Sequence, residues 1–292
     1  MFIATLIAAD RLDQGQISEC SDRLTSAGCA PAGSGWLDEG IAADLLFALD
    51  SSAARAALEG VLPDVDVVVQ SLITRAKRLL VADMDSTMIT VECIDELADY
   101  AGIKPQIAAV TEAAMRGELD FEAALDARVA LLAGLDEGVI DQCLAERVQL
   151  TPGACTLVRT MKSRGARAIL VSGGFTRFAA PVAAQIGFDE AIANRLNITA
   201  GKLDGTVARP IVGAQTKRDA LIAAAVEAAI PIESTLAVGD GANDLAMIGA
   251  AGLGMAFRAK PVVAAAADAR IEHNDLSALL YAQGIARRDW VA

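Results

Sequence analysis

Short apolar runs that end abruptly in polar or glycine residues recur along the chain beyond residue 78. Residues 79–82, 166–171 and 235–238 are such runs, and residues 254–257 and 269–272 are weaker ones. Runs of this length between turn residues are typical of buried strands. Because helical patterns separate them, we predict a Rossmann-like α/β fold with a parallel sheet, which presents its functional groups at the carboxyl ends of the strands.

The N-terminal segment has a different pattern, in which strands and helices alternate over residues 1–75. We predict strands at residues 2–8, 33–36, 44–49 and 65–69, and helices at residues 16–27 and 52–62, the second capped by Ser51-Ser52. This βαββαβ order is ferredoxin-like, which predicts a small α+β domain followed by a linker at residues 71–77. Such a domain would regulate the protein or oligomerise it, with a homodimer as one outcome, or it would be a packing appendage that binds nothing.

A helical insert interrupts the predicted core after its first strand. Apolar residues repeat at helical spacing through residues 93–150, beginning with Ile94, Leu97 and Ala98. An insert at the carboxyl end of a strand is placed to act as a cap that expels water from a site. Later, residues 197–207 read as a β-hairpin with Asp204-Gly205 as its turn. We therefore expect residues 78–292 to form a core that carries a helical cap at about 90–150.

Charge and composition exclude several classes of function. The net charge of −13 and the pI near 4.6 provide no basic footprint for nucleic acid. No apolar run reaches the length of a membrane span, and Asp10 and Arg11 interrupt the N-terminal run too early for a signal peptide. Five cysteines without a CxxC pair favour reduced thiols in the cytoplasm. The lone histidine, His273, has no partners for a triad or metal site.

Two aspartates one residue apart follow the first core strand. Alternate side chains of an extended chain share a face, so Asp83 and Asp85 should point together while Met84 points away. Carboxylates held this close repel each other unless a cation shares them, and Mg²⁺ prefers hard oxygen ligands. The pattern therefore indicates a magnesium site, with an Asp-rich turn as the plain alternative.

Polar residues also follow the next two strands. Ser172-Gly173-Gly174 would form a tight turn whose backbone N–H groups can approach an oxyanion. Asp240 in the segment Gly239-Asp240-Gly241-Ala242-Asn243-Asp244 can complete a metal site with the first pair, and Asn243 and Asp244 can support it or simply cap a helix. Lys217, at a helix start, is either solvated or reaches a phosphoryl oxygen.

The order of these motifs resembles the haloacid dehalogenase superfamily of phosphotransferases, over about residues 79–284. A narrower resemblance, to the phosphoserine phosphatases of this superfamily, adds residues of the helical insert: Glu92, Met115, Phe121 and Arg128. The N-terminal segment resembles ACT-type domains by pattern alone. Arg128 lies on an apolar helix face, where an arginine either snorkels to solvent or holds a carboxylate.

The resemblance implies a Mg²⁺-dependent phosphatase with O-phospho-L-serine as its small-molecule substrate. It gives Asp83 the role of nucleophile and Asp85 that of general acid and base. Asp83, the backbone carbonyl of Asp85, and Asp240 would hold the metal. Ser172, Gly173 and Lys217 would bind the phosphoryl oxygens, and Asn243 would bind substrate and support the site together with Asp244. Glu92, Met115, Phe121 and Arg128 would recognise the serine part. Two alternatives stay open: a phosphatase for another small phosphomonoester, and a non-catalytic amino-acid sensor.

Overall fold

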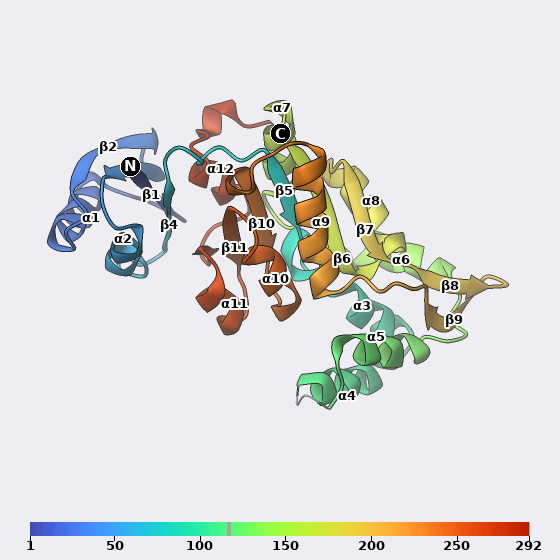
Figure 1. The fold of residues 1–292 in the computed structure, drawn as a ribbon. Coiled ribbons are helices and arrows are strands. Elements are labelled where there is room, and N and C mark those ends of the chain that lie inside the picture. The colour runs from blue at the N-terminus through green and yellow to red at the C-terminus, as the bar shows by residue number, and fades with distance from the viewer. Residues whose placement is uncertain (116–117, 292) are drawn as a thin grey trace.

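The computed structural model describes residues 1–115 and 118–291, drawn in Figure 1. Within these ranges the strands form a four-stranded sheet, a six-stranded sheet and a two-stranded hairpin. None of the helices in these ranges is long and apolar enough to cross a membrane. The α/β architecture predicted from the sequence is confirmed.

The N-terminal part has the predicted ferredoxin-like arrangement. Its antiparallel sheet has the order β2-β3-β1-β4, and its helices α1 and α2 bury Leu24 and Leu58 against one face of that sheet. The element bounds are β1 Phe2–Ala8, α1 Gln14–Ser26, β2 Pro31–Asp38, β3 Ala42–Phe47, α2 Ser51–Leu58 and β4 Val65–Ser71. The predicted cap of α2 was wrong: Asp50 is the N-cap, and its side chain accepts a hydrogen bond from the backbone N–H of Ala53.

The core is a parallel sheet in the order β12-β11-β10-β5-β6-β7, so the first core strand lies near its centre. Leu80 and Ala82 of β5 face one apolar cluster, whereas Leu79 and Val81 face another beneath α9. Both faces are thus covered by helices, as a parallel sheet requires. The bounds are β5 Leu79–Ala82, α7 Ala154–Ser163, β6 Arg167–Phe175, α8 Thr176–Ile186, β7 Glu190–Asn194, α9 Ala214–Glu227, β10 Thr235–Gly239, α10 Leu245–Ile248, β11 Leu253–Phe257, α11 Pro261–Ala266, β12 Ala269–Ile271 and α12 Ala278–Ala282.

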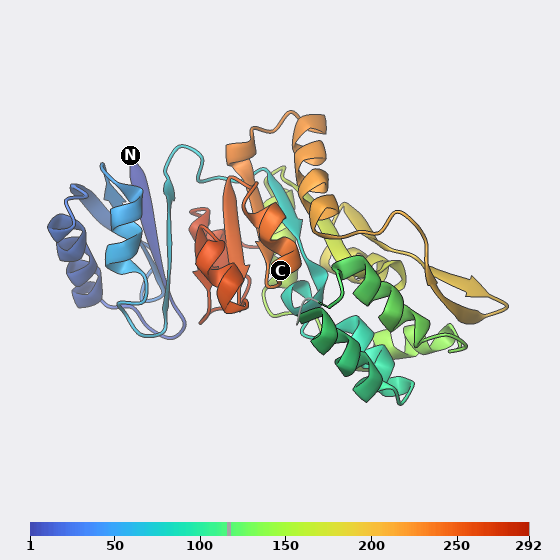
Figure 2. The same ribbon diagram turned by 60° about the horizontal axis from the view of Figure 1, so that its bottom comes forward.

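The helical insert forms a cap beside one end of this sheet, as Figure 2 shows. Its helices are α3 Cys93–Tyr100, α4 Lys104–Met115, α5 Phe121–Ala130 and α6 Gly138–Arg147. The hairpin of β8 (Leu196–Thr199) and β9 (Lys202–Val207) packs against α5, and the backbone N–H of Gly134 donates to the Leu203 carbonyl at 2.8 Å. The predicted hairpin turn was wrong, because the chain reverses at Ala200 and Gly201.

The N-terminal sheet also packs against the core. Ile7, Ala42 and Val68, on the sheet face away from α1 and α2, belong to the same apolar cluster as Leu279 and Leu280 of α12. The predicted linker does connect β4 to β5, but it is fixed in place. Arg75 within it donates hydrogen bonds to the Asp44 carboxylate and the Thr5 hydroxyl on one side, and to the backbone carbonyls of Tyr281 and Ala282 on the other. The interface is therefore both apolar and hydrogen-bonded.

This interface predicts that the core depends on the N-terminal part for stability. Residues 78–292 expressed alone would expose apolar side chains of α12, and each buried side chain of this kind contributes about 1.5–3 kcal/mol. We expect the truncated chain to lose at least about 2 kcal/mol of unfolding free energy, measured by urea denaturation. The intact Arg75→Ala chain should show a smaller loss in the same direction. Equal unfolding midpoints for the truncated and intact chains would contradict this expectation.

Candidate active site

The aspartate pair leaves the central strand β5 as the sequence predicted. Asp83 and Asp85 both line one cavity, whereas Met84 between them is fully buried in the apolar core. The next residue, Ser86, has φ of 54° in the left-handed region, which turns the chain sharply away from the strand. Such strained positions cluster at functional sites.

Lys217 joins two carboxylates of the site, although it is not among the residues that line the cavity. It comes from the first turn of α9, has no exposed surface, and its Nζ lies 2.5 Å from Asp83 Oδ1 and 2.6 Å from Asp244 Oδ1. The solvated alternative for this lysine was therefore wrong. Burial alone would lower the pKa of Lys217, but the two carboxylates raise it, so the ammonium stays charged. Burial also raises the pKa of Asp83 well above its ordinary value, although Lys217 opposes that shift.

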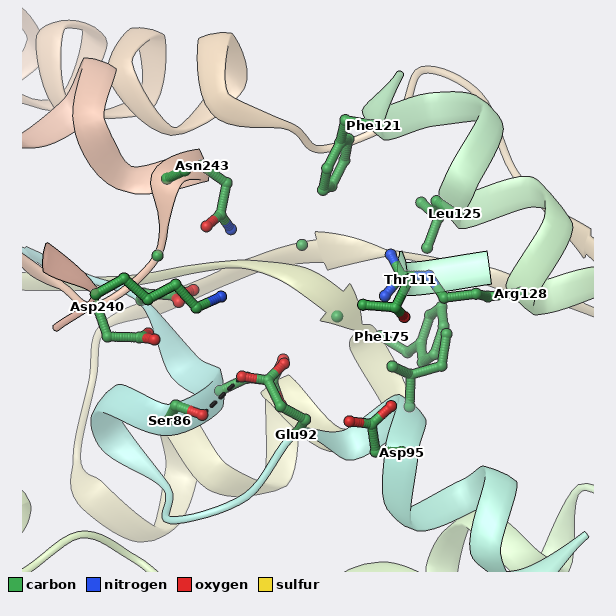
Figure 3. Close-up of a pocket in the computed structure, with 18 residues that line it drawn as sticks. Ser86, Glu92, Asp95, Thr111, Phe121, Leu125, Arg128, Phe175, Asp240 and Asn243 are labelled. Carbon is green, nitrogen blue, oxygen red and sulfur yellow. Dashed lines mark hydrogen bonds between the residues drawn. The ribbon is translucent and has the colours of Figure 1, made fainter. Parts of the chain in front are cut away.

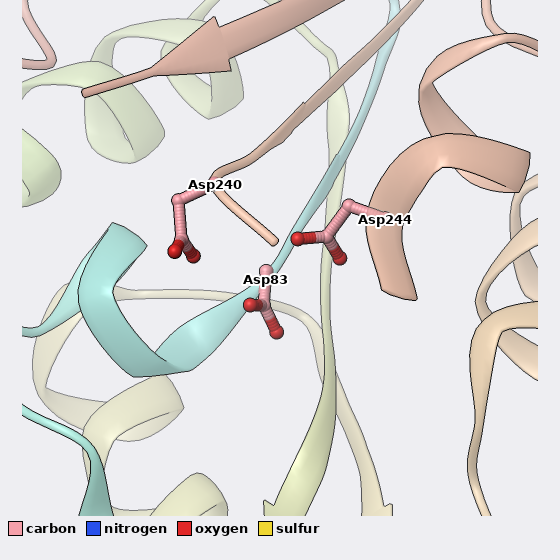
Figure 4. Close-up of side chains that lie close together, drawn as sticks. All are labelled: Asp83, Asp240 and Asp244. Atoms are coloured by element: carbon pink, nitrogen blue, oxygen red, sulfur yellow. The ribbon is translucent and has the colours of Figure 1, made fainter. Parts of the chain in front are cut away.

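A third carboxylate, that of Asp240 directly after β10, lies beside the carboxylates of Asp83 and Asp244. Oxygens of Asp83, Asp240 and Asp244 lie within 4.8 Å of one another. Figure 4 shows the three side chains gathered together. Burial and the neighbouring Asp244 and Glu92 raise the pKa of Asp240 to about 6, against smaller opposing effects of Thr87 and Lys260, so its ionised form is disfavoured. Clustered hard oxygen donors of this kind fit a divalent cation such as Mg²⁺. The side chain of Asp85 is not part of this cluster.

Asp85 instead faces the start of the cap. Its carboxylate accepts a hydrogen bond from the backbone N–H of Cys93 at 3.0 Å and one from the Ser172 hydroxyl at 3.4 Å. Burial and the nearby Glu92 raise its pKa to about 6. A Cβ added to Gly174 would stand 2.7 Å from Asp85 Oδ2, so only glycine allows this approach. A carboxyl group with a pKa in this range can exchange a proton near neutral pH.

The segment Ser172-Gly173-Gly174 differs from the predicted tight turn. It continues β6 as far as Phe175, with an irregular register between Val171 and Phe175. The Ser172 hydroxyl is fully buried and accepts a hydrogen bond from the backbone N–H of Gly174 at 2.8 Å. The glycines still meet the site, because Gly173 and Gly174 both line the cavity.

The cavity has a volume of about 550 Å³ and lies between the sheet end and the cap. Figure 3 shows Asn243 and Asp240 on the core side, facing Phe121 and Arg128 of α5. Glu92 lies at its rim, where its Oε1 accepts a hydrogen bond from the Ser86 hydroxyl at 2.6 Å. The core and the cap thus contribute to the same chamber.

Arg128 points into this cavity rather than snorkelling to open solvent. Within the described ranges its one hydrogen bond runs from Nε to the Ala124 carbonyl at 3.2 Å, and no carboxylate forms an ion pair with it. Burial lowers the pKa of Arg128, while Asp95 and Glu92 oppose that effect. A guanidinium in this position has donors free to bind an anionic ligand.

Several site residues were not predicted from the sequence. Thr87 donates a hydrogen bond to Asp240 at 3.2 Å, and the buried Asn194 donates one to the Gly173 carbonyl at 2.8 Å. Their positions in the sequence could have indicated both residues, because Thr87 adjoins the aspartate motif and Asn194 is the last residue of β7. Asp95, Thr111 and Lys260 also line the cavity. Met115 ends α4, but its side chain lies outside the described part of the structure.

Known proteins resemble this chain in sequence or in fold. A phosphoserine phosphatase of Streptomyces coelicolor is 50% identical over 237 residues, which are 81% of this chain and 57% of that protein. A HAD-family hydrolase of Salmonella enterica serovar Typhi has a solved structure that superposes with a TM-score of 0.84 at 29% identity, covering 98% of both chains. A probable phosphoserine phosphatase of Vibrio cholerae superposes with a TM-score of 0.77 at 34% identity, over 98% of this chain and 88% of that one.

The chain spans a little more than half the length of the Streptomyces relative. The family model of haloacid dehalogenase-like hydrolases matches residues 80–249, which include most of β5, the cap, Lys217 and the Asp240 segment. That match covers more than half of the chain, and it contains the acidic cluster and the residues that line the cavity other than Lys260. The chain therefore belongs to the haloacid dehalogenase-like hydrolases.

Proposed function

We propose that this protein is a phosphoserine phosphatase, which hydrolyses O-phospho-L-serine to L-serine and phosphate as the last step of serine biosynthesis. The observation that carries this proposal is one cavity lined by two sets of charged residues, one from the core and one from the cap. The carboxylates Asp83, Asp85 and Asp240 line it from the core, and Glu92 and Arg128 line it from the cap. The first set suits phosphoryl transfer, and the second suits the ammonium and carboxylate of an amino acid.

In this proposal the reaction proceeds in two steps on Asp83. A carboxylate oxygen of Asp83 attacks phosphorus while the bond from phosphorus to the seryl oxygen breaks, and Asp85 gives that oxygen a proton. Water then attacks the aspartyl-phosphate, Asp85 takes a proton from it, and phosphate leaves with Asp83 restored. The hydrogen bonds from Cys93 and Ser172 hold Asp85 toward the cavity for both transfers.

The acidic cluster is the proposed metal site. Asp83, the backbone carbonyl of Asp85, and Asp240 would hold Mg²⁺, with Asp244 close enough to contribute. A bound Mg²⁺ would neutralise phosphate charge beside the nucleophile. Lys217 remains as a fixed positive charge next to Asp83, and Thr87 orients Asp240.

The remaining residues would bind the substrate. Ser172, Gly173, Lys217 and Asn243 are proposed for the phosphoryl oxygens, and Asp244 orients Lys217. Glu92 would pair with the ammonium and Arg128 with the carboxylate, while Phe121 and Met115 would close the cavity over the substrate.

The organisation of the whole chain is part of the proposal. We assign residues 1–75 to an ACT-like domain and residues 78–292 to the phosphatase core, with the cap at about 90–150. The substrate is a small molecule, the setting is cytoplasmic, and a homodimer is the proposed assembly.

A substrate panel tests the proposal against its main rival, a phosphatase for another small phosphomonoester. We expect kcat/KM for O-phospho-L-serine to exceed that for glycerol phosphate and sugar phosphates, because those lack the ammonium and carboxylate. Equal values would favour the rival. No hydrolysis of any member would favour the amino-acid sensor, although the intact carboxylate set at the cavity argues against it.

The assignment of the nucleophile predicts different effects for the two aspartates. Asp83→Asn should abolish turnover and the covalent intermediate, because the amide cannot attack phosphorus. Asp85→Asn should slow turnover by about 10²–10⁴-fold, the usual contribution of general acid–base catalysis. Trapping an acid-stable, base-labile phosphoenzyme checks this, and a covalent adduct on Asp83→Asn would refute the assignment.

Specificity for the carboxylate predicts a selective effect at Arg128. A charge-assisted hydrogen bond is worth about 1.5–3 kcal/mol, so Arg128→Ala should cut kcat/KM for phosphoserine about 10- to 150-fold. Hydrolysis of p-nitrophenyl phosphate, which has no carboxylate, should change little. Arg147→Ala is the matched control, since this cap arginine pairs with Glu96 and Asp99 and does not line the cavity. Equal losses on both substrates would instead assign Arg128 to the fold or to phosphate.

The raised pKa of Asp240 predicts how the metal-free protein responds to pH. The folded state binds the Asp240 proton more tightly than the unfolded state, whose pKa is near 3.8, so the ionised group destabilises the fold above pH 6. In chelated protein Asp240→Asn should therefore raise the unfolding free energy at pH 8, by up to about 3 kcal/mol. The gain should fade as pH falls from 6 to 4, where wild type becomes protonated.

Urea denaturation of chelated protein at pH 8 and pH 4.5 provides the measurement. The exposed Asp22→Asn variant is the control and should show no such gain. Adding Mg²⁺ should stabilise wild type more than Asp240→Asn. An Asp240→Asn protein that is less stable than wild type at pH 8 without metal would overturn the expectation.

A further inference from the structure

The loop between β11 and α11 forms part of the cavity wall on the core side. Lys260 lines the cavity, and its backbone N–H donates to the backbone carbonyl of Asp240 at 3.1 Å. Arg258, two residues earlier, has φ of 45°. A non-glycine residue is unfavourable in the left-handed region, so neighbouring contacts must hold the loop in this shape.

The contacts that hold Arg258 come from Ile271, the last residue of β12, and from Asn274 in the segment that follows it. The backbone N–H of Arg258 donates to the Ile271 carbonyl at 2.9 Å, and its Nη2 donates to the Asn274 carbonyl at 3.3 Å. The loop that touches Asp240 is therefore tied to residues 271–274, through the Ile271 carbonyl at the backbone of Arg258 and through the Asn274 carbonyl at its side chain.

Residues 272–274 are in turn held by Asp66, which belongs to β4 of the N-terminal sheet. Its carboxylate is only 4% exposed and accepts hydrogen bonds from the backbone N–H groups of Glu272 at 2.9 Å, His273 at 3.3 Å and Asn274 at 3.1 Å. The Asn274 side chain donates to the same carboxylate at 2.9 Å and to the Ile7 carbonyl at 3.0 Å. Successive N–H groups around one carboxylate form an anion-binding nest.

We propose that Asp66 is a positioning residue for the active site. Asp66 holds residues 272–274 in place, and this segment together with Ile271 holds Arg258. The loop that contains Arg258 in turn places Lys260 beside the backbone of Asp240. Without the carboxylate, the backbone N–H groups of Glu272, His273 and Asn274 lose a shared charged acceptor, which favours movement of the segment. The N-terminal part thus positions one wall of the cavity indirectly, although none of its own residues lines that cavity.

Amide hydrogen exchange tests the structural part of this proposal without any reference to activity. In Asp66→Ala we expect exchange at Arg258 and Lys260 to accelerate by at least about 10-fold, and Asp66→Asn, which keeps the side-chain volume and one acceptor, should give a smaller increase. Tyr281→Phe is the control, because it removes another contact between the two parts, the hydrogen bond from Tyr281 to Asp38 at 2.6 Å. Unchanged exchange in both Asp66 variants, or equal acceleration in Tyr281→Phe, would overturn the proposal.

Kinetics test the link to the site, and this arm rests on the proposed function. The Mg²⁺ concentration for half-maximal phosphoserine hydrolysis should rise about 3- to 10-fold in Asp66→Ala and in Arg258→Ala, with kcat at saturating Mg²⁺ nearly unchanged, a size typical of coupling between distinct sites. Tyr281→Phe should match wild type. A faster exchange without any change in the Mg²⁺ requirement would refute the positioning role. A wild-type protein that does not hydrolyse phosphoserine would refute the proposed function and leave the exchange result to decide this proposal.

Discussion

The buried ammonium of Lys217 between two carboxylates is the interaction on which the site depends. Lys217 and Asp244 have no exposed surface and Asp83 is 4% exposed, so all three charges have been removed from water. Desolvation of an ion pair is compensated only when the geometry is close and further hydrogen bonds complete it. Here Asp244 also accepts a hydrogen bond from the backbone N–H of Gly241 at 3.0 Å. The lysine thereby fixes one carboxylate that follows β5 and another at the start of α10.

The Lys217 ammonium alone does not neutralise the carboxylates gathered at this site. Asp240 and Asp85 both have a pKa raised to about 6, chiefly by burial, and Glu92 adds to the effect at each. The sheet enforces this crowding, because β5 and β10 are neighbours in register and deliver their carboxyl ends to the same edge. A Cβ on Gly239 would stand 2.4 Å from Asp244 Cγ, so the end of β10 is glycine where the carboxylate must approach. The excess negative charge is what makes a divalent cation the natural ligand of this edge.

The core strands and the motifs at their ends could be predicted because each apolar run is short and ends in its functional residue. Features that depend on residues distant in the sequence could not be predicted. A lysine at a helix start looks solvated until the fold places Asp83 and Asp244 around it. Asp204-Gly205 is a strong turn signal, yet Gly205 is needed elsewhere: a Cβ there would stand 2.9 Å from the Ala133 Cβ of the cap. Residues 71–77 look like a linker because local sequence does not reveal the partners of Arg75.

Contacts between residues distant in the sequence also show that the N-terminal part is not separate from the core. A domain with no catalytic residue looks separable in sequence, since nothing in its motifs refers to the core. In the structure its sheet has two apolar faces, one covered by α1 and α2 and the other by α12. A sheet that needs the core to cover its second face is not an independent appendage. Because Asp66 and Arg75 add polar contacts on this same face, a change in the packing or tilt of the N-terminal sheet would be transmitted to β12 and the segment that follows it.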